Sequence, residues 1–272
     1  MARKAKALLD ELSRPGPHRV LRGDLALVGM PGVVCTPAAG LGLPAVAFGH
    51  GWLQPPHRYH GLLRHLASWG IVAAAPGTHV GPLGSHRLLA ADLSTALDVC
   101  VGVRLGEGDI SVDPGKLGLA GHSTGGGSAV LAAAADDRVK AVATLAAAQT
   151  RPFATEAATG CTAPSIHLAA GKDVVAPPVG HAEAIARAWA GPARVWTLPK
   201  AGHMGFTEGK HWSGLLVSGG SEGTTRRVAR SLLTAFFLAE LAGQRHYAAL
   251  LDNPVKGAQL SYDSEAELAP SA

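Results

Sequence analysis

A serine between two glycines is the residue with the clearest chemical potential in this sequence. Ser123 stands in "GHSTG", after the apolar run "KLGLAGH" and before an alanine-rich stretch. That order predicts a strand, a sharp turn and a helix, and the glycines at 121 and 125 relieve the crowding of such a turn. The turn would present the Ser123 hydroxyl, which becomes a nucleophile when a neighbouring base takes its proton.

Two further polar residues each follow a predicted strand. Asp173 lies in "LAAGKDVVAPP" and His203 lies in "LPKAGHMGF". Taken singly, they could be a turn aspartate and a loop histidine. Functional groups of a parallel sheet gather where its strands end, and the chain order Ser, Asp, His is that of the nucleophile-elbow hydrolases. We therefore predict a catalytic set in which Ser123 is the nucleophile, His203 the base and Asp173 the acid.

Backbone amides near the serine could stabilise an oxyanion. "FGHGW" at 48–52 is a glycine-relaxed turn after an early strand, and it predicts a donor at Trp52 N–H. Thr124 N–H, at the start of the helix after Ser123, is the second predicted donor. Candidate substrate-pocket residues are His50 and His122 beside the two turns, Gln149 after a later strand, and Trp212. His211 and Trp212 belong to a long loop at 207–223 that either caps the site or covers the surface.

The elements that must position these residues alternate along the chain. Helical spacing of apolar residues predicts helices, and short apolar runs predict buried strands, which together imply a mainly parallel sheet covered on both faces. We expect an α/β fold in one domain over 1–272, with an N-terminal extension at 1–20 and a flexible tail at 262–272. Strands are predicted at 44–51, 71–77, 116–122, 139–147, 165–171 and 193–203, with two short strands at 25–37 that turn at Pro31 and Gly32. Helices are predicted at 8–16, 58–70, 86–103, after 123, at 181–191 and at 224–241.

Composition narrows the classes of partner. The 272 residues are 47% hydrophobic and 16% charged, with a formal net charge of +4, which favours a sizeable core. The densest basic group is Arg226, Arg227 and Arg230, whose spacing indicates a solvated helix face rather than a nucleic-acid patch. The sequence contains no run of eighteen uncharged apolar residues, so we expect no membrane span. The oligomeric state is left open.

Histidines and cysteines suggest no metal or disulfide framework. His57, His60 and His65 lie close together but lack a nearby carboxylate or cysteine, so we expect no metal ion and no cofactor. The three cysteines form no CxxC pair and are interpreted as buried small hydrophobes. The N-terminal segment has no continuous apolar region typical of a signal peptide, which favours a cytoplasmic location.

On these stretches the sequence resembles a known family. The segments "AVAFGHGW", "YHGLLRHLASWGIVAAAP", "KLGLAGHSTGGGSAVLAAA", "LAAGKDVVAPP" and "AGHMGF" are similar to the α/β-hydrolase fold, and within it to cutinase-like polyesterases and dienelactone-hydrolase-type enzymes. The resemblance implies a triad of Ser123, His203 and Asp173 and an oxyanion hole from the amides of Trp52 and Thr124. It also makes secretion the alternative location, because such polyesterases are normally secreted.

The sequence departs from those polyesterases at three places. Thr124 stands where they usually have methionine, and "AAAQTRPF" lacks the tryptophan that packs on an aromatic substrate ring. The cysteine pair near their C-terminus is also missing. We therefore expect a serine esterase, lipase-like or polyesterase-like, that acts on small-molecule esters and handles aromatic polyesters poorly. A thioesterase or amidase would use the same triad. A non-catalytic binding protein on this fold is the other alternative, although no triad member is missing.

Overall fold

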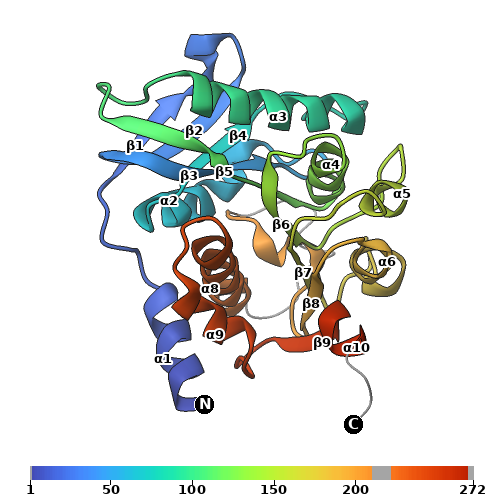
Figure 1. Cartoon of the computed structure of the whole chain (residues 1–272). Helices are drawn as coiled ribbons and strands as arrows, with labels where there is room; N and C mark the ends of the chain where they lie inside the picture. Colours follow the sequence, from blue (N-terminus) through green and yellow to red (C-terminus); the bar gives the residue numbers. More distant parts are fainter. Residues whose placement is uncertain (1, 210–221, 269–272) are drawn as a thin grey trace.

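The computed structural model describes residues 2–209 and 222–268, and in this part of the chain nine strands form one sheet (Figure 1). The strand order is β1-β2-β4-β3-β5-β6-β7-β8-β9. The strands from β3 to β8 pair in parallel, while β1 with β2, β2 with β4, and β8 with β9 pair antiparallel. The parallel centre and the alternating helices give the predicted α/β-hydrolase fold.

The bounds of the elements follow. The strands are β1 Val20–Asp24, β2 Gly32–Pro37, β3 Gly40–Gly49, β4 Val72–Pro76, β5 Ile110–His122, β6 Val139–Leu145, β7 Ser165–Ala170, β8 Ala193–Leu198 and β9 Gln259–Asp263. The α-helices are α1 Ala2–Leu12, α2 His60–Ser68, α3 His86–Gly102, α4 Thr124–Ala133, α5 Ala154–Ala158, α6 Ala182–Ala188, α8 Glu222–Glu240, α9 Ala248–Leu251 and α10 Ser264–Leu268. Short 3₁₀ helices are η1 Leu25–Val28, η2 Pro56–Tyr59, η3 Pro178–Gly180, η4 His203–Phe206 and η5 Arg245–Tyr247.

Helices cover both faces of the sheet, as Figure 1 shows. One hydrophobic cluster lies between the sheet and α1, α2, α8 and α9, and a second lies between the sheet and α3, α4, α5 and α6. The central strands are therefore apolar on both sides, and the tripeptide run Val72, Ala73 and Ala74 of β4 is buried throughout. Two filled layers hold the strand ends in fixed relative positions, which a multi-residue site requires.

The predicted pair of strands at 25–37 is wrong in its first half. Residues 25–28 form η1, which begins where the Asp24 side chain accepts a hydrogen bond from Ala26 N (2.9 Å), and only β2 follows. The partner of β2 is β1 at 20–24, which begins at the last residue of the expected extension and for which no strand was predicted. The short apolar run of η1 ends at Gly29, whose positive φ of 85° closes the turn.

The chain ends also pack more closely than predicted. The expected flexible tail is wrong for residues 262–268, because β9 adds an antiparallel strand to β8 and α10 follows it. Tyr262 stacks under the Arg187 guanidinium, 4.8 Å from the ring centre, and Asp263 pairs with Arg194 at 3.0 Å. At the other end, α1 begins earlier than the helix predicted at 8–16 and ends at Leu12, and it buries Leu9 and Leu12 in the core. Each of these contacts joins a terminus to an element far away in the sequence, so the pattern of the terminal segment alone does not predict it.

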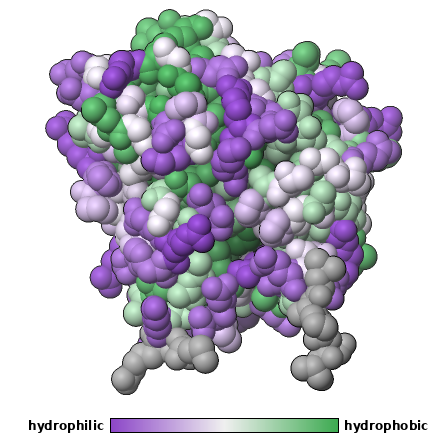
Figure 2. Space-filling model, in the orientation of Figure 1, coloured by the Kyte–Doolittle hydropathy of each residue, from purple (hydrophilic) through white to green (hydrophobic). Residues whose placement is uncertain are grey.

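The surface is mostly polar in the view of Figure 2, with apolar side chains gathered at the top over the N-terminal segment. There η1 carries Leu27 and Val28, both exposed. None of the helices in the described ranges has the length and apolar character needed to cross a membrane.

The three cysteines should remain free thiols that react slowly in the folded protein. Cys35, Cys100 and Cys161 are all buried and unpaired, and burial raises the pKa of Cys35 to about 11 and that of Cys100 to about 12. Because the thiolate is the reactive form, iodoacetamide at pH 7.5 should modify few of them before unfolding and all three in denaturant without reductant. Intact-mass measurement checks this. A fully denatured sample that takes up only one label would show a disulfide and contradict the expectation.

Candidate active site

Ser123 occupies the sharp turn between β5 and α4. Its backbone angles, φ 55° and ψ −126°, lie in a region that non-glycine residues rarely adopt. The turn is held by Ser123 N donating to Leu145 O (2.9 Å) and by Ala148 N donating to Ser123 O (3.0 Å). The strained conformation lifts the side chain off the end of the strand, as the "GHSTG" pattern predicts.

The flanking glycines are required by close backbone contact. A Cβ at Gly121 would lie 2.2 Å from the Gly125 carbonyl oxygen, and a Cβ at Gly125 would lie 2.3 Å from the backbone of Gly49. The ends of β3 and β5 therefore touch the first turn of α4 directly. This contact places the turn after β3, which contains Trp52, beside the serine.

Ser123, His203 and Asp173 form a continuous hydrogen-bonded array. The His203 Nε2 atom lies 2.8 Å from Ser123 Oγ, and His203 Nδ1 lies 2.7 Å from Asp173 Oδ2. All three side chains are buried, with 4–6% of each residue exposed. Ser123 follows β5, Asp173 follows β7 and His203 follows β8. His203 is 30 positions from Asp173 and 80 positions from Ser123 in the sequence. The structure thus brings together the three residues singled out from the sequence.

Asp173 is held from its other oxygen by the loop that follows it. The Oδ1 atom accepts hydrogen bonds from Val175 N (2.9 Å) and Ala176 N (2.8 Å). These two donors leave Oδ2 to accept from His203 Nδ1–H. The His203 ring then carries its proton on Nδ1, and Nε2 is free to accept the Ser123 hydroxyl proton.

The amides of Trp52 and Thr124 belong to backbone close to Ser123: Trp52 follows Gly51, and Thr124 follows the serine itself. Gly51 lies against the serine, since a Cβ added there would be 3.3 Å from Ser123 Cβ. Within the described part of the chain neither amide donates to a protein acceptor. Thr124 is the first residue of α4, so its N–H is one of the helix's unsatisfied donors. These are two available donors at the end of the sheet where the serine lies.

The rings of His50 and His122 are buried rather than open to a pocket. His50 is 1% exposed, with its ring nitrogens 3.0 Å from Gly51 O and 2.6 Å from Thr78 O. His122 is fully buried, with its nitrogens 2.9 Å from Tyr59 Oη and 2.9 Å from His203 O. Both rings therefore bind protein atoms around the two turns, and direct contact of either with substrate stays a prediction.

Gln149 ties together two loops at the same end of the sheet. Its side-chain amide donates to Gly180 O (3.2 Å), and its backbone N donates to His181 Nδ1 (3.0 Å). His181 is a residue that the sequence analysis missed. Burial lowers its pKa, and the nearby Asp173 acts in the opposite direction, which places the imidazole near the acid. Its only sequence signal is its place in the proline-rich loop after Asp173.

Two further predictions concern the long loop and a metal ion. His211 and Trp212 lie outside the described residues, as does most of the loop at 207–223. Among the residues that are described, no three histidine, cysteine, aspartate or glutamate side chains come close enough to hold a metal ion.

Exposed apolar side chains come from the loops that follow β3, β6 and β7. Trp52 is 56% exposed, and its indole Nε1 donates to Pro82 O (3.2 Å), which fixes the ring. Phe153, Val174 and Val175 are also at least half exposed. Because β3 to β8 run parallel, these loops leave the same edge of the sheet as the triad residues, and their side chains offer apolar contact area at that edge.

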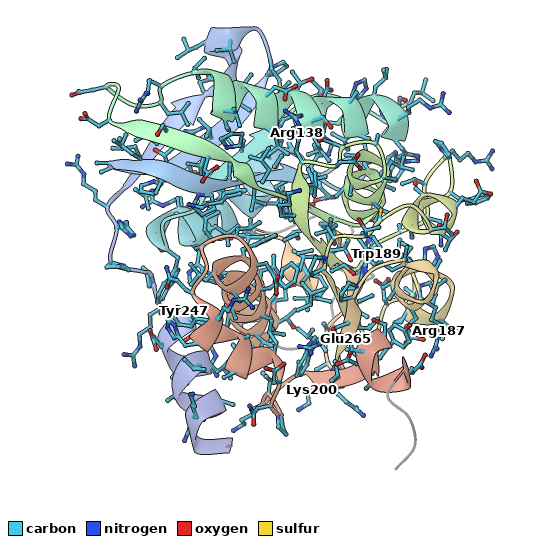
Figure 3. The ribbon with its side chains drawn as sticks, viewed as in Figure 1. Arg138, Arg187, Trp189, Lys200, Tyr247 and Glu265 are labelled. Atoms are coloured by element: carbon cyan, nitrogen blue, oxygen red, sulfur yellow. The ribbon has the colours of Figure 1, made fainter. Side chains whose placement is uncertain are left out.

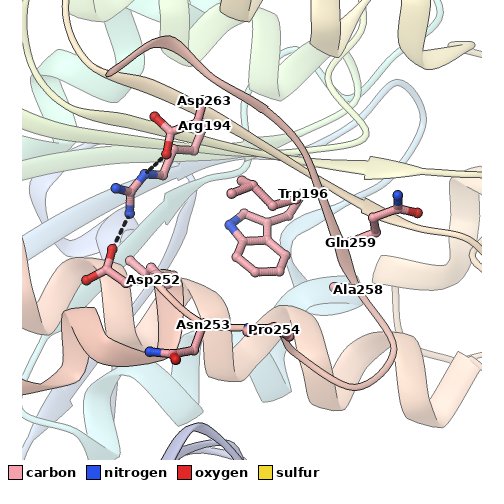
Figure 4. Close-up of a pocket in the computed structure, with 10 residues that line it drawn as sticks. Arg194, Trp196, Asp252, Asn253, Pro254, Ala258, Gln259 and Asp263 are labelled. Carbon is pink, nitrogen blue, oxygen red and sulfur yellow. Dashed lines mark hydrogen bonds and ion pairs between the residues drawn. The ribbon is translucent and has the colours of Figure 1, made fainter. Parts of the chain in front are cut away.

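A separate cavity of about 520 Å³ lies at the β8–β9 edge, away from these strand ends. Figure 4 shows Trp196 at its centre and Arg194 joined to Asp252 and Asp263 at one side. None of the residues that line this cavity belongs to the triad.

The nine-stranded sheet and the hydrogen-bonded serine, histidine and aspartate at its strand ends define the chain as an α/β-hydrolase. A family model described as PET hydrolase-like matches residues 35–209, more than half of the chain, and the protein belongs to this family. It is accordingly an ester hydrolase of the α/β-hydrolase type. The chain matches no curated protein.

Proposed function

We propose that the protein is a serine esterase that works through an acyl-enzyme intermediate. The observation that carries the proposal is the pair of hydrogen bonds, 2.8 Å and 2.7 Å, that join Ser123 to His203 and His203 to Asp173. His203 takes the proton of Ser123 as the oxygen attacks the ester carbonyl. It then protonates the departing alcohol, which leaves the acyl group on Ser123.

The second half of the reaction uses the same groups with water. His203 takes a proton from water, the resulting hydroxide attacks the acyl-enzyme, and the proton returns to Ser123 as the acid leaves. Asp173 holds the ring tautomer and stabilises the imidazolium in both halves. The amides of Trp52 and Thr124 stabilise the negative oxygen of each tetrahedral intermediate, each contributing on the order of 3 kcal/mol.

The proposed substrates are small esters with aliphatic acyl groups, and aromatic polyesters should be poor substrates. An aromatic acyl group gains about 1 kcal/mol from stacking on a ring. The loop after β6 offers Ala147, Ala148 and Gln149 instead of tryptophan, and the Gln149 side chain is bound to Gly180. The exposed ring of Trp52, one residue after Gly51 in the turn that lies against the serine, is the one that could compensate.

The test compares kcat/KM for aliphatic and terephthalate-type soluble esters that share a leaving group, together with a series of increasing acyl length. We expect the aliphatic esters to be hydrolysed several-fold faster, and the Ser123→Ala variant to show no turnover above background. Thr124→Met restores the methionine of the relatives while keeping the backbone donor, and it should raise the aromatic-to-aliphatic ratio. A wild-type preference for the aromatic acyl group would show that another residue supplies the stacking surface.

A further inference from the structure

Four buried groups beneath the triad form one chain of hydrogen bonds. Gly51 N donates to Tyr59 Oη (3.0 Å), Tyr59 Oη lies 2.9 Å from His122 Nδ1, and His122 Nε2 lies 2.9 Å from His203 O. Tyr59 and His122 are both 0% exposed. The chain therefore links the turn that precedes Trp52 to the backbone of His203 without passing through Ser123.

The direction of each bond in this chain follows from its partners. The carbonyl of His203 can only accept, so His122 carries a proton on Nε2. Burial lowers the pKa of His122 to about 3, so the ring is neutral near pH 7 and its Nδ1 accepts. The Tyr59 hydroxyl therefore donates to His122, and its oxygen accepts from Gly51 N–H. Each donor in this chain of hydrogen bonds therefore has an acceptor, in one consistent arrangement.

One end of the chain fixes the orientation of an oxyanion donor. The Gly51 carbonyl belongs to the same peptide plane as Trp52 N–H, and it accepts from Gln54 N at 3.0 Å. In a trans peptide the N–H and the C=O point in opposite directions. Tyr59 holds the preceding peptide through the Gly51 N–H. Gln54 N and His50 Nδ1, each 3.0 Å from Gly51 O, hold the peptide plane that carries Trp52 N–H. The contacts on both sides of Gly51 together fix where the amide of Trp52 points.

The other end of the chain holds the base. The His203 carbonyl accepts from His122 Nε2–H at the start of η4, and the two imidazole rings lie 5.0 Å apart between their centres. The ring of His203 is fixed by Asp173, whereas its backbone is fixed by His122. A shift of either turn would therefore be transmitted through Tyr59 and His122 to the other.

We propose that Tyr59 is a positioning residue, which through its hydroxyl keeps the oxyanion donor at Trp52 and the base His203 in register with Ser123. The inference rests on the proposed serine esterase function. Tyr59 itself is covered and does not reach substrate, so it acts through Gly51 and His122.

Tyr59→Phe isolates the hydroxyl, because the phenyl ring keeps the packing against Phe48, 4.8 Å away between ring centres. We expect kcat for a short-chain ester to fall about tenfold with KM changed by less than twofold, since a donor displaced by a fraction of an ångström weakens transition-state stabilisation more than ground-state binding. The rate at which a phosphonate labels Ser123 should fall by a similar factor.

Tyr247→Phe is the matched control. The Tyr247 hydroxyl donates to Glu11 Oε1 (2.9 Å), and Figure 3 shows Tyr247 beside α1. This variant also removes one hydroxyl from a buried tyrosine, so it should lower the unfolding midpoint comparably while leaving kcat unchanged. Equal kcat values for Tyr59→Phe and Tyr247→Phe would overturn the proposal. An inactive wild-type protein would instead refute the esterase function itself.

A measurement on the wild-type protein covers the case in which Tyr59→Phe does not fold. Nitrogen-15 NMR of the His122 ring at pH 7 should show the neutral form with its proton on Nε2 and an accepting Nδ1. A ring protonated on Nδ1 would mean that Tyr59 does not donate to it, and the proposed chain would be wrong.

Discussion

His203→Ala is expected to reduce kcat for a short-chain ester by about five to six orders of magnitude. The ring accepts the Ser123 proton through a 2.8 Å contact, and among the described residues no other side-chain base contacts Ser123 Oγ. Without the imidazole the hydroxyl remains a weak nucleophile and the leaving alcohol has no proton donor. Steady-state rates with a chromogenic acetate ester measure the loss.

His246→Ala provides the control for this change. His246 is exposed on η5 and stacks on Tyr247, so its removal should leave turnover within about twofold. A His203→Ala variant that folds and retains near-normal activity would place the base on another residue and contradict the assignment of His203.

Asp173→Asn is expected to lower kcat by about 10⁴-fold while the fold is retained. The Oδ1 atom accepts from two backbone N–H groups, so the asparagine oxygen will occupy that position and its amide will face His203. An amide donates where the carboxylate accepts, which moves the His203 proton to Nε2. In that tautomer the ring cannot accept the proton of Ser123.

Asp252→Asn serves as the comparison, since it alters an exposed carboxylate that pairs with Arg194 at 2.8 Å. It should leave the rate unchanged. If Asp173→Asn lost less than tenfold in kcat, the aspartate would hold the loop of Val175 and Ala176 without orienting the base.

The strand and helix pattern and the positions of Ser123, Asp173 and His203 could be predicted from the sequence. The central strands are short apolar runs between amphipathic helices, and their ends are marked by glycine turns. Since parallel strands end at one edge, placing each residue after its strand was enough to bring the three together. Local sequence patterns were therefore enough to predict the three triad residues.

The remaining features depend on contacts between distant segments. Tyr59 lies in the helix predicted at 58–70 and its ring packs in the core, yet its hydroxyl bonds to Gly51 and His122. The polar residues of β9 gave no signal of a strand, because its pairing is supplied by β8 and its ion pair by Arg194. No periodicity within a segment encodes such pairing.

Phosphonate labelling tests the central claim most directly. The wild-type protein is incubated with a fluorophosphonate, digested, and mapped by mass spectrometry. The account predicts one adduct, on Ser123, formed together with loss of esterase activity and absent or strongly slowed in His203→Ala. An active protein that acquires no adduct on Ser123, or that is labelled and inhibited at another serine, would contradict the assignment of Ser123 as the nucleophile.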